Sequence, residues 1–109
     1  MNKDFIEEIY REIVENGMVM YKDLFENTEI DNNTIEYWAN SIIFYNSLSS
    51  YQKDILFKII EQTIIDTISS VFSILDNSFN NYNIDISINS INTDDELQDT
   101  FLDFVEEKN

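Results

Sequence analysis

A chain of 109 residues has room for one domain, and a hydrophobic fraction of 43% is sufficient to build its core. The sequence has no cysteine and no histidine, which excludes disulfides, thiolate zinc sites and histidine-based catalysis, and one glycine cannot form a glycine-rich phosphate loop. The formal net charge of −16 at pH 7 opposes direct binding to nucleic acids or anionic membranes.

The first predicted element is an amphipathic helix over residues 4–16, where apolar residues recur at three- and four-residue spacing and glutamates fill the other side. Gly17 suits the left-handed residue that ends a helix. Residues 18–25 fit a short helix or, over residues 18–21, an extended stretch. Residues 27–33 are polar and predict a loop.

A second helix is predicted over residues 33–47, with Asp31 or Asn32 as its N-cap. Tyr37 and Phe44, one heptad apart, widen its apolar stripe onto an adjoining face. We interpret both faces as core, since stripes at helical spacing are usually interior. The alternative is an exposed aromatic patch that binds a partner, because Tyr and Trp are enriched at interface hot spots. The aromatic residues of this region are Tyr37, Trp38, Phe44, Tyr45, Tyr51 and Phe57.

A third helix is predicted to begin at a capping box formed by Ser49 and Gln52. It either reaches Leu75 or kinks near Thr67. Because apolar residues cover most of its circumference, we expect other elements to surround it. The charge distribution agrees, since residues 32–76 hold only five of the 22 acids.

After a turn-rich loop over residues 76–81, isoleucines at every second position from Ile84 to Ile88 predict a half-buried strand. We therefore expect one short β-strand or hairpin near residues 79–91. Its ladder partner is residues 18–21, residues 79–82 or a second chain.

A last helix is predicted to begin with Thr93 as N-cap and Glu96 as its capping-box partner. Its inward stripe contains Leu97, Phe101, Phe104 and Val105. The sequence thus predicts a single all-α or nearly all-α domain over residues 1–109, a compact bundle of four to five helices around the long central one. An acidic start and no apolar run long enough to span a bilayer lead us to expect a cytoplasmic protein.

Carboxylates are the only groups that suggest chemistry. Asp66, flanked by Ile65, is interpreted as solvent-facing rather than catalytic, given the preference of aspartate for exposure. Asp76, Ser78 and Asn80 alternate like the first ligands of a calcium loop, but the loop glycine and the final glutamate of that motif are missing. We therefore predict no catalytic residue, no metal site and no cofactor.

The remaining acids are concentrated in the terminal helices, where they form one continuous field if these helices are neighbours. Such a field captures and orients a positively charged partner. We therefore expect a non-enzymatic protein that neutralises a basic protein such as a toxin or nuclease, as an immunity protein, antitoxin or phage inhibitor does. One version is a DNA mimic. The candidate partner-binding residues are Glu7, Glu8, Glu12, Glu15, Tyr37, Phe44, Asp99, Asp103, Glu106 and Glu107.

The alternative function is that of a homo-oligomeric structural or accessory protein. It would form a dimer through the Ile84–Ile88 strand or through the aromatic face of the second helix. Light scattering distinguishes the two hypotheses, because only the alternative requires a stable oligomer of the chain alone.

Overall fold

The chain folds into four helices and one short hairpin, as shown by a computed structural model that describes residues 2–77 and 82–109. The mostly helical fold and the hairpin predicted from the sequence are confirmed. The first helix has three consecutive parts, α1, η1 and α2. The elements in chain order are α1 (Asn2–Ile9), η1 (Tyr10–Glu15), α2 (Asn16–Asn27), α3 (Glu36–Asn46), α4 (Ser50–Leu75), β1 (Ser87–Ile88), β2 (Ile91–Asn92) and α5 (Leu97–Lys108).

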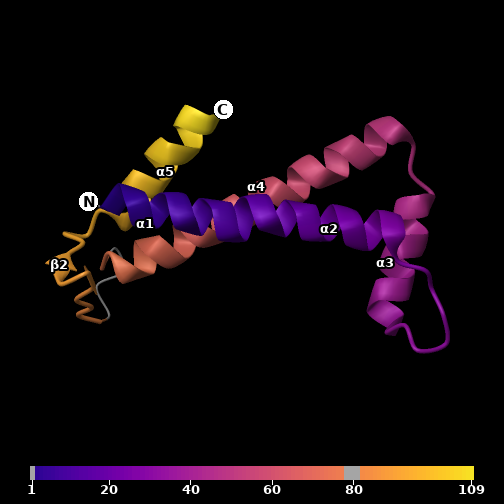
Figure 1. Cartoon of the computed structure of the whole chain (residues 1–109), viewed down its shortest axis with the longest axis horizontal. Coiled ribbons are helices and arrows are strands. Elements are labelled where there is room, and N and C mark those ends of the chain that lie inside the picture. The colour runs from indigo at the N-terminus through magenta and orange to yellow at the C-terminus, as the bar shows by residue number, and fades with distance from the viewer. Residues whose placement is uncertain (1, 78–81) are drawn as a thin grey trace.

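The molecule is longer than the compact bundle that the sequence suggested. It measures 48 × 29 × 24 Å, and its radius of gyration is 17.6 Å, against roughly 13 Å for a compact domain of this length. The first helix and α4 cross along the long axis, with α5 and the hairpin at one end and α3 at the other (Figure 1). These shorter elements do not surround α4, since Val71 and Ile74 on it are exposed even at the end where α5 and the hairpin lie.

The first helix remains unbroken through a π-helical segment, η1. In a regular α-helix each four-residue step advances by about 40° around the axis, so residues at that spacing gradually rotate away from a common face. The wider turns of η1 offset this drift and keep one face buried. The buried residues at this spacing are Ile6, Tyr10, Val14 and Met18.

The prediction that Gly17 ends the first helix is wrong. Gly17 has no positive φ and lies inside α2. A Cβ at this position would lie 3.7 Å from Cδ1 of Ile64, an ordinary van der Waals contact with α4. Of the two alternatives for residues 18–25, the helix is the one observed, and Phe25 is buried near its end.

The N-terminus predicted for the second helix is also wrong, because α3 begins at Glu36 and its N-cap is Ile35. The Asp31 carboxylate instead accepts hydrogen bonds from the Asn33 amide at 2.8 Å and from the Thr34 hydroxyl at 3.3 Å. Asp31 therefore orders the turn before the helix, a competing use of short polar side chains.

The predicted capping box of α4 is confirmed. The Ser49 hydroxyl accepts a hydrogen bond from the Gln52 amide at 3.2 Å, and the Ser49 amide donates to the Gln52 side chain at 2.9 Å. The helix then runs without interruption to Leu75. The hydroxyl of Thr67 donates to the Thr63 carbonyl at 2.8 Å and does not break the helix there.

The hairpin pairs β1 with β2, so Ile88 lies opposite Ile91 and the ladder partner is none of those proposed from the sequence. Residues 79–81 lie outside the described part of the chain. Asn89 and Ser90 connect the strands with φ values of 52° and 67°, which is the pattern of a two-residue type I′ turn. In a segment without glycine, asparagine supplies one of the left-handed residues.

The N-terminus of α5 is capped by Asp76 at the end of α4, not by Thr93. The Asp76 carboxylate accepts hydrogen bonds from the Leu97 amide at 3.1 Å and the Gln98 amide at 2.8 Å. Thr93 is buried, and its carbonyl accepts hydrogen bonds from the Asn2 side chain and the Glu96 amide. Asp76 thereby ties the start of α5 to the end of α4, and Asn2 ties α1 to the segment that precedes α5.

Two hydrophobic cores result. The α5-end core lies between α1, η1, the second half of α4 and α5, and consists of Ile6, Tyr10, Val14, Ile65, Ile68, Phe72, Leu97 and Phe101. The α3-end core lies between α2, α3 and the first half of α4, and consists of Met18, Phe25, Ile42, Tyr45 and Phe57.

Candidate functional site

The terminal helices are neighbours, as the hypothesis of an acidic field required. α5 packs against α1 and η1 through an edge-to-face contact between Phe104 and Tyr10, whose ring centroids are 5.3 Å apart. Phe101 of α5 is fully buried in the same core. We call the eight exposed carboxylates that the sequence singled out on these helices the acidic surface: Glu7, Glu8, Glu12, Glu15, Asp99, Asp103, Glu106 and Glu107.

Three bases reduce the charge of the acidic surface without neutralising it. Their ion pairs are Lys3–Glu107 at 3.8 Å, Arg11–Glu12 at 3.8 Å and Lys108–Glu15 at 3.6 Å. All six side chains are solvent-exposed, so these pairs are weak. Within residues 2–77 and 82–109, five carboxylates of the surface have no such pair: Glu7, Glu8, Asp99, Asp103 and Glu106. Eight acids against three bases leave five net negative charges.

Different parts of the acidic surface have different local shapes. Glu7, Glu15 and Glu107 line a shallow depression between the terminal helices, together with Arg11 and Lys108. Asp99, Asp103 and Glu106 recur at four- and three-residue spacing and so share the outer face of α5. The fold thus brings the eight predicted terminal acids to one end of the molecule, where Asp99, Asp103 and Glu106 of α5 have no ion pair among the described residues.

Tyr37 and Phe44 lie at the opposite end and do not belong to the acidic surface. They are 67% and 55% exposed, so the interpretation of both α3 faces as core is wrong. Only the face with Ile42 and Tyr45 is buried, because α2 and α4 reach α3 from one direction only. The alternative, an exposed aromatic face, is the one observed.

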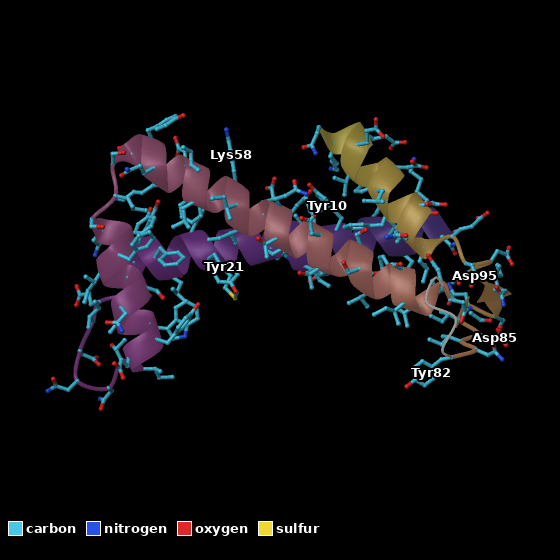
Figure 2. All side chains as sticks on the ribbon, turned by 180° about the vertical axis from the view of Figure 1, so that it is seen from behind. Tyr10, Tyr21, Lys58, Tyr82, Asp85 and Asp95 are labelled. Carbon is cyan, nitrogen blue, oxygen red and sulfur yellow. The ribbon has the colours of Figure 1, made fainter. Side chains whose placement is uncertain are left out.

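A groove of about 370 Å³ lies beside this face, between α2, α3 and α4, and we call it the apolar groove. Side chains of these three helices gather around it near Tyr21 (Figure 2). Trp38, the single tryptophan, lies in its wall in an edge-to-face contact with Tyr37 at 4.9 Å. Residues that line it include Tyr21, Tyr37, Trp38, Phe44, Leu56 and Ile59.

Aromatic packing holds the floor of the apolar groove in place. Phe25 stacks on Tyr45 at 5.0 Å and meets Phe57 edge-to-face at 6.2 Å. The Tyr45 hydroxyl donates to the Glu26 carboxylate at 3.2 Å. Burial raises the pKa of Tyr45 above its ordinary value of 10.0, and the hydrogen bond and negative charge of Glu26 add to the effect.

Two lysines cover the rings on the other side of this floor. Lys22 lies 5.5 Å from the centroid of the Phe57 ring, and Lys53 lies 4.7 Å from that of Tyr45. Neither lysine lines the apolar groove, whose lining contains no charged residue. Lys58 extends from α4 into solvent (Figure 2). The groove is thus an uncharged surface whose nearby bases face elsewhere.

The sequence analysis did not identify the parts of the groove contributed by α2 and α4. The expectation that other elements surround the third helix would bury Ile59, which is 57% exposed, and Tyr21 lies in the segment predicted as either a short helix or an extended stretch. The four-residue spacing of Ile55, Ile59 and Thr63 is the signal that marks a separate stripe on α4. The sequence alone does not show whether another element covers that stripe.

The carboxylates considered for chemistry have structural contacts. Asp66 is exposed and accepts a hydrogen bond from Gln62 at 2.8 Å. Asp76 caps α5, while Ser78 and Asn80, the other suggested calcium ligands, lie outside the described residues. Across the described part of the chain, no group of three or more acids is placed to hold a metal ion.

Among these same residues, no helix combines the length and apolar character needed to cross a bilayer. Comparisons with known protein families, with curated proteins and with solved structures find no match to this chain. Hypotheses about function therefore rest on the acidic surface and the apolar groove themselves.

Proposed function

We propose that this chain is a non-enzymatic protein that binds and neutralises a basic protein partner. The observation that supports the proposal is the side-by-side packing of the terminal helices, which gathers the eight carboxylates of the acidic surface at one end. In the part of the chain that the structure describes, three bases form ion pairs with them there. A surface of this charge attracts a basic protein and repels nucleic acid and other acidic proteins.

The physical role of the acidic surface is to accelerate and orient the encounter. Complementary fields raise association rates by about 10- to 1000-fold over those of uncharged surfaces, and salt reduces this gain. Exposed charges contribute less to the lifetime of the complex, which depends on buried contacts. The carboxylates of α5 without ion pairs, Asp99, Asp103 and Glu106, are expected to contribute most.

The test measures association rates with a basic partner captured from the native host at low salt. In the test variant, four carboxylates of the acidic surface become amides: Glu7→Gln, Glu8→Gln, Asp99→Asn and Asp103→Asn. We expect the association rate at low salt to fall about tenfold and the dissociation rate to change little. The difference between variant and wild type should shrink as salt is raised.

A matched control removes the same number of charges from residues outside the acidic surface. Its substitutions are Asp23→Asn, Glu29→Gln, Glu36→Gln and Asp54→Asn. The proposal requires this control to retain most of the wild-type association rate. Equal losses in the two variants would mean that net charge alone matters, and recovery of no basic partner at low salt would contradict the proposal.

Inhibition by DNA mimicry is the narrower version of this function. The supporting observation is that Asp99, Asp103 and Glu106 form a row of negative charges along the outer face of α5. If carboxylates occupy phosphate positions of a nucleic-acid-binding protein, duplex DNA must compete for the partner. A partner bound equally well with excess DNA present would exclude this version and leave the broader proposal intact.

A further inference from the structure

The walls of the apolar groove limit the backbone conformation of what can bind there. All of its lining residues come from α2, α3 and α4, and none from a strand. A bound peptide therefore finds no sheet edge with which to pair its amides and carbonyls. Polar backbone groups buried against an apolar wall need partners, so the peptide must satisfy them internally, as a helix does.

The two aliphatic hydroxyls of the groove donate within their own helices, and the other polar groups of its lining are the hydroxyls of Tyr21 and Tyr37 and the indole N–H of Trp38. The Ser41 hydroxyl donates to the Tyr37 carbonyl at 2.8 Å, and the Thr63 hydroxyl donates to the Ile59 carbonyl at 2.8 Å. These two donors are thus used within their own helices. The remaining surface is mainly aromatic and aliphatic, and it matches the apolar face of an amphipathic helix.

Charge determines the rest of the occupant's chemistry. The groove lies in residues 18–66, which contain eight acids and three bases, and two of those bases lie over the Phe57 and Tyr45 rings. A second copy of the chain would bring another −16 charge to this surface, so like-charge repulsion opposes a dimer. A helix with lysines or arginines on its polar face meets attraction instead.

We infer that the apolar groove binds a basic amphipathic helix of the partner protein. This inference deepens the proposed function, on which it rests, by assigning the anchoring contact to Trp38, Phe44 and Ile59. The acidic surface brings the partner in, and the groove holds one of its helices. Loss of the groove contacts should therefore speed dissociation and leave the salt dependence of association unchanged.

The test uses Trp38 as its reporter, because it is the single tryptophan and lies in the groove wall. The probe is a synthetic helical peptide with leucines at three- and four-residue spacing and lysines at the other positions. Its control is a twin with glutamate in place of lysine. We expect the lysine peptide to shift Trp38 emission to shorter wavelength with saturation, and the glutamate twin to produce no shift.

Matched variants of α4 then locate the binding site. Ile59→Ala, within the groove, should weaken binding of the lysine peptide about tenfold. Ile74→Ala, an exposed isoleucine outside the groove, should leave it unchanged. Both positions are exposed, so circular dichroism should show wild-type helix content in each variant.

Other occupants of the groove give different results, and each overturns the inference. A shift of Trp38 emission with protein concentration alone, together with a dimer by sedimentation, identifies a second copy. A response to a neutral small apolar molecule such as cyclohexanol, with none to the lysine peptide, identifies a small-molecule site. An unresponsive Trp38, with salt-dependent partner capture intact, rejects the groove inference and keeps the proposed function.

Discussion

The two ends of the molecule are built from the same kinds of residue but differ in how completely they are enclosed. At the α5 end, Ile6 and Phe101 are 0% exposed, and Val14 and Leu97 are 1% exposed. At the α3 end the most buried core residue, Ile42, retains 2%, and Phe25 and Phe57 retain 9% and 8%. At the α5 end Tyr10 and Phe104 pack on each other, and Tyr82 beside the hairpin is 75% exposed, while Tyr37 and Phe44 are exposed at the α3 end.

The difference lies in what closes each core. The α5 end uses a buried carboxylate cap, a hairpin and a buried asparagine to close its core. The α3 end leaves large apolar side chains in water, which monomeric proteins keep mainly where they bind something. Under the proposed function, the α5 end maintains the fold and presents charge, while the α3 end provides the contact surface.

The largest expected effect comes from removing a ring at the enclosed end. Phe101→Ala leaves a cavity beside Phe72, whose ring centroid is 5.7 Å away, and should lower the free energy of unfolding by about 3–5 kcal/mol. Phe44→Ala, at an exposed position, should change it by less than about 0.5 kcal/mol. Urea unfolding followed by circular dichroism measures both values. Similar losses in the two variants would contradict the contrast between the ends.

The carboxylate cap of α5 gives the next largest effect. Asp76→Ala removes the acceptor of the Leu97 and Gln98 amides and should lower the free energy of unfolding by about 2–3 kcal/mol. Asp66→Ala, on the same helix but exposed, should cost less than about 0.5 kcal/mol. Hydrogen exchange should show faster opening of α5 in the first variant only. Unchanged protection there would mean that packing alone holds α5.

A stabilising change is expected where the two ends join. Gly17 lies inside a helix, and a Cβ there would make only an ordinary contact with Ile64. Gly17→Ala should therefore raise the free energy of unfolding by about 0.5–1 kcal/mol through helix propensity. Thermal unfolding measures the change. A clear destabilisation would show that the first helix and α4 approach more closely than the structure indicates.

Alkaline pH should destabilise the α3 end through Tyr45, as it should the α5 end through Tyr10, whose pKa burial also raises. Burial and Glu26 raise the pKa of Tyr45 in the folded state above the ordinary value of 10.0, so folding favours the neutral phenol. This contribution is constant below pH 10 and is lost as the pH rises beyond it. Tyr45→Phe should therefore reduce the decline in the free energy of unfolding above pH 10. At lower pH the free energies of unfolding of the variant and the wild type should differ by a constant amount. Equal declines in the free energy of unfolding above pH 10 would show that ionisation of Tyr45 does not contribute to the loss of stability.

Local signals in the sequence predicted part of this structure correctly. The Ser49–Gln52 capping box and the four helical regions depend on neighbouring residues, so periodicity and capping patterns reveal them. The continuation through Gly17 depends on η1 and on contact with α4, which no local pattern records. Asp76 caps a helix that begins 21 residues later, so Thr93 was the nearer but wrong candidate.

For the candidate surfaces too, the sequence predicts what neighbouring residues determine and does not predict what tertiary contacts determine. The acids of the terminal helices could be identified from their sequence positions, and only the docking of α5 on the first helix was needed to join them. Burial of Tyr37 and Phe44 could not be decided, because helical spacing gives the faces of α3 but not the number of neighbours covering them. The groove depends on where α2, α3 and α4 meet, and that is a property of the fold.

Site-specific photo-crosslinking in the native host tests the central claim most directly. A benzophenone amino acid replaces Phe44 in the apolar groove or, as a control, Val19, which is 68% exposed and outside the groove. We predict that position 44, and not position 19, crosslinks to a basic protein through a lysine- or arginine-rich amphipathic helix. A crosslink only to a second copy of the chain, or equal products from both positions, would contradict the account.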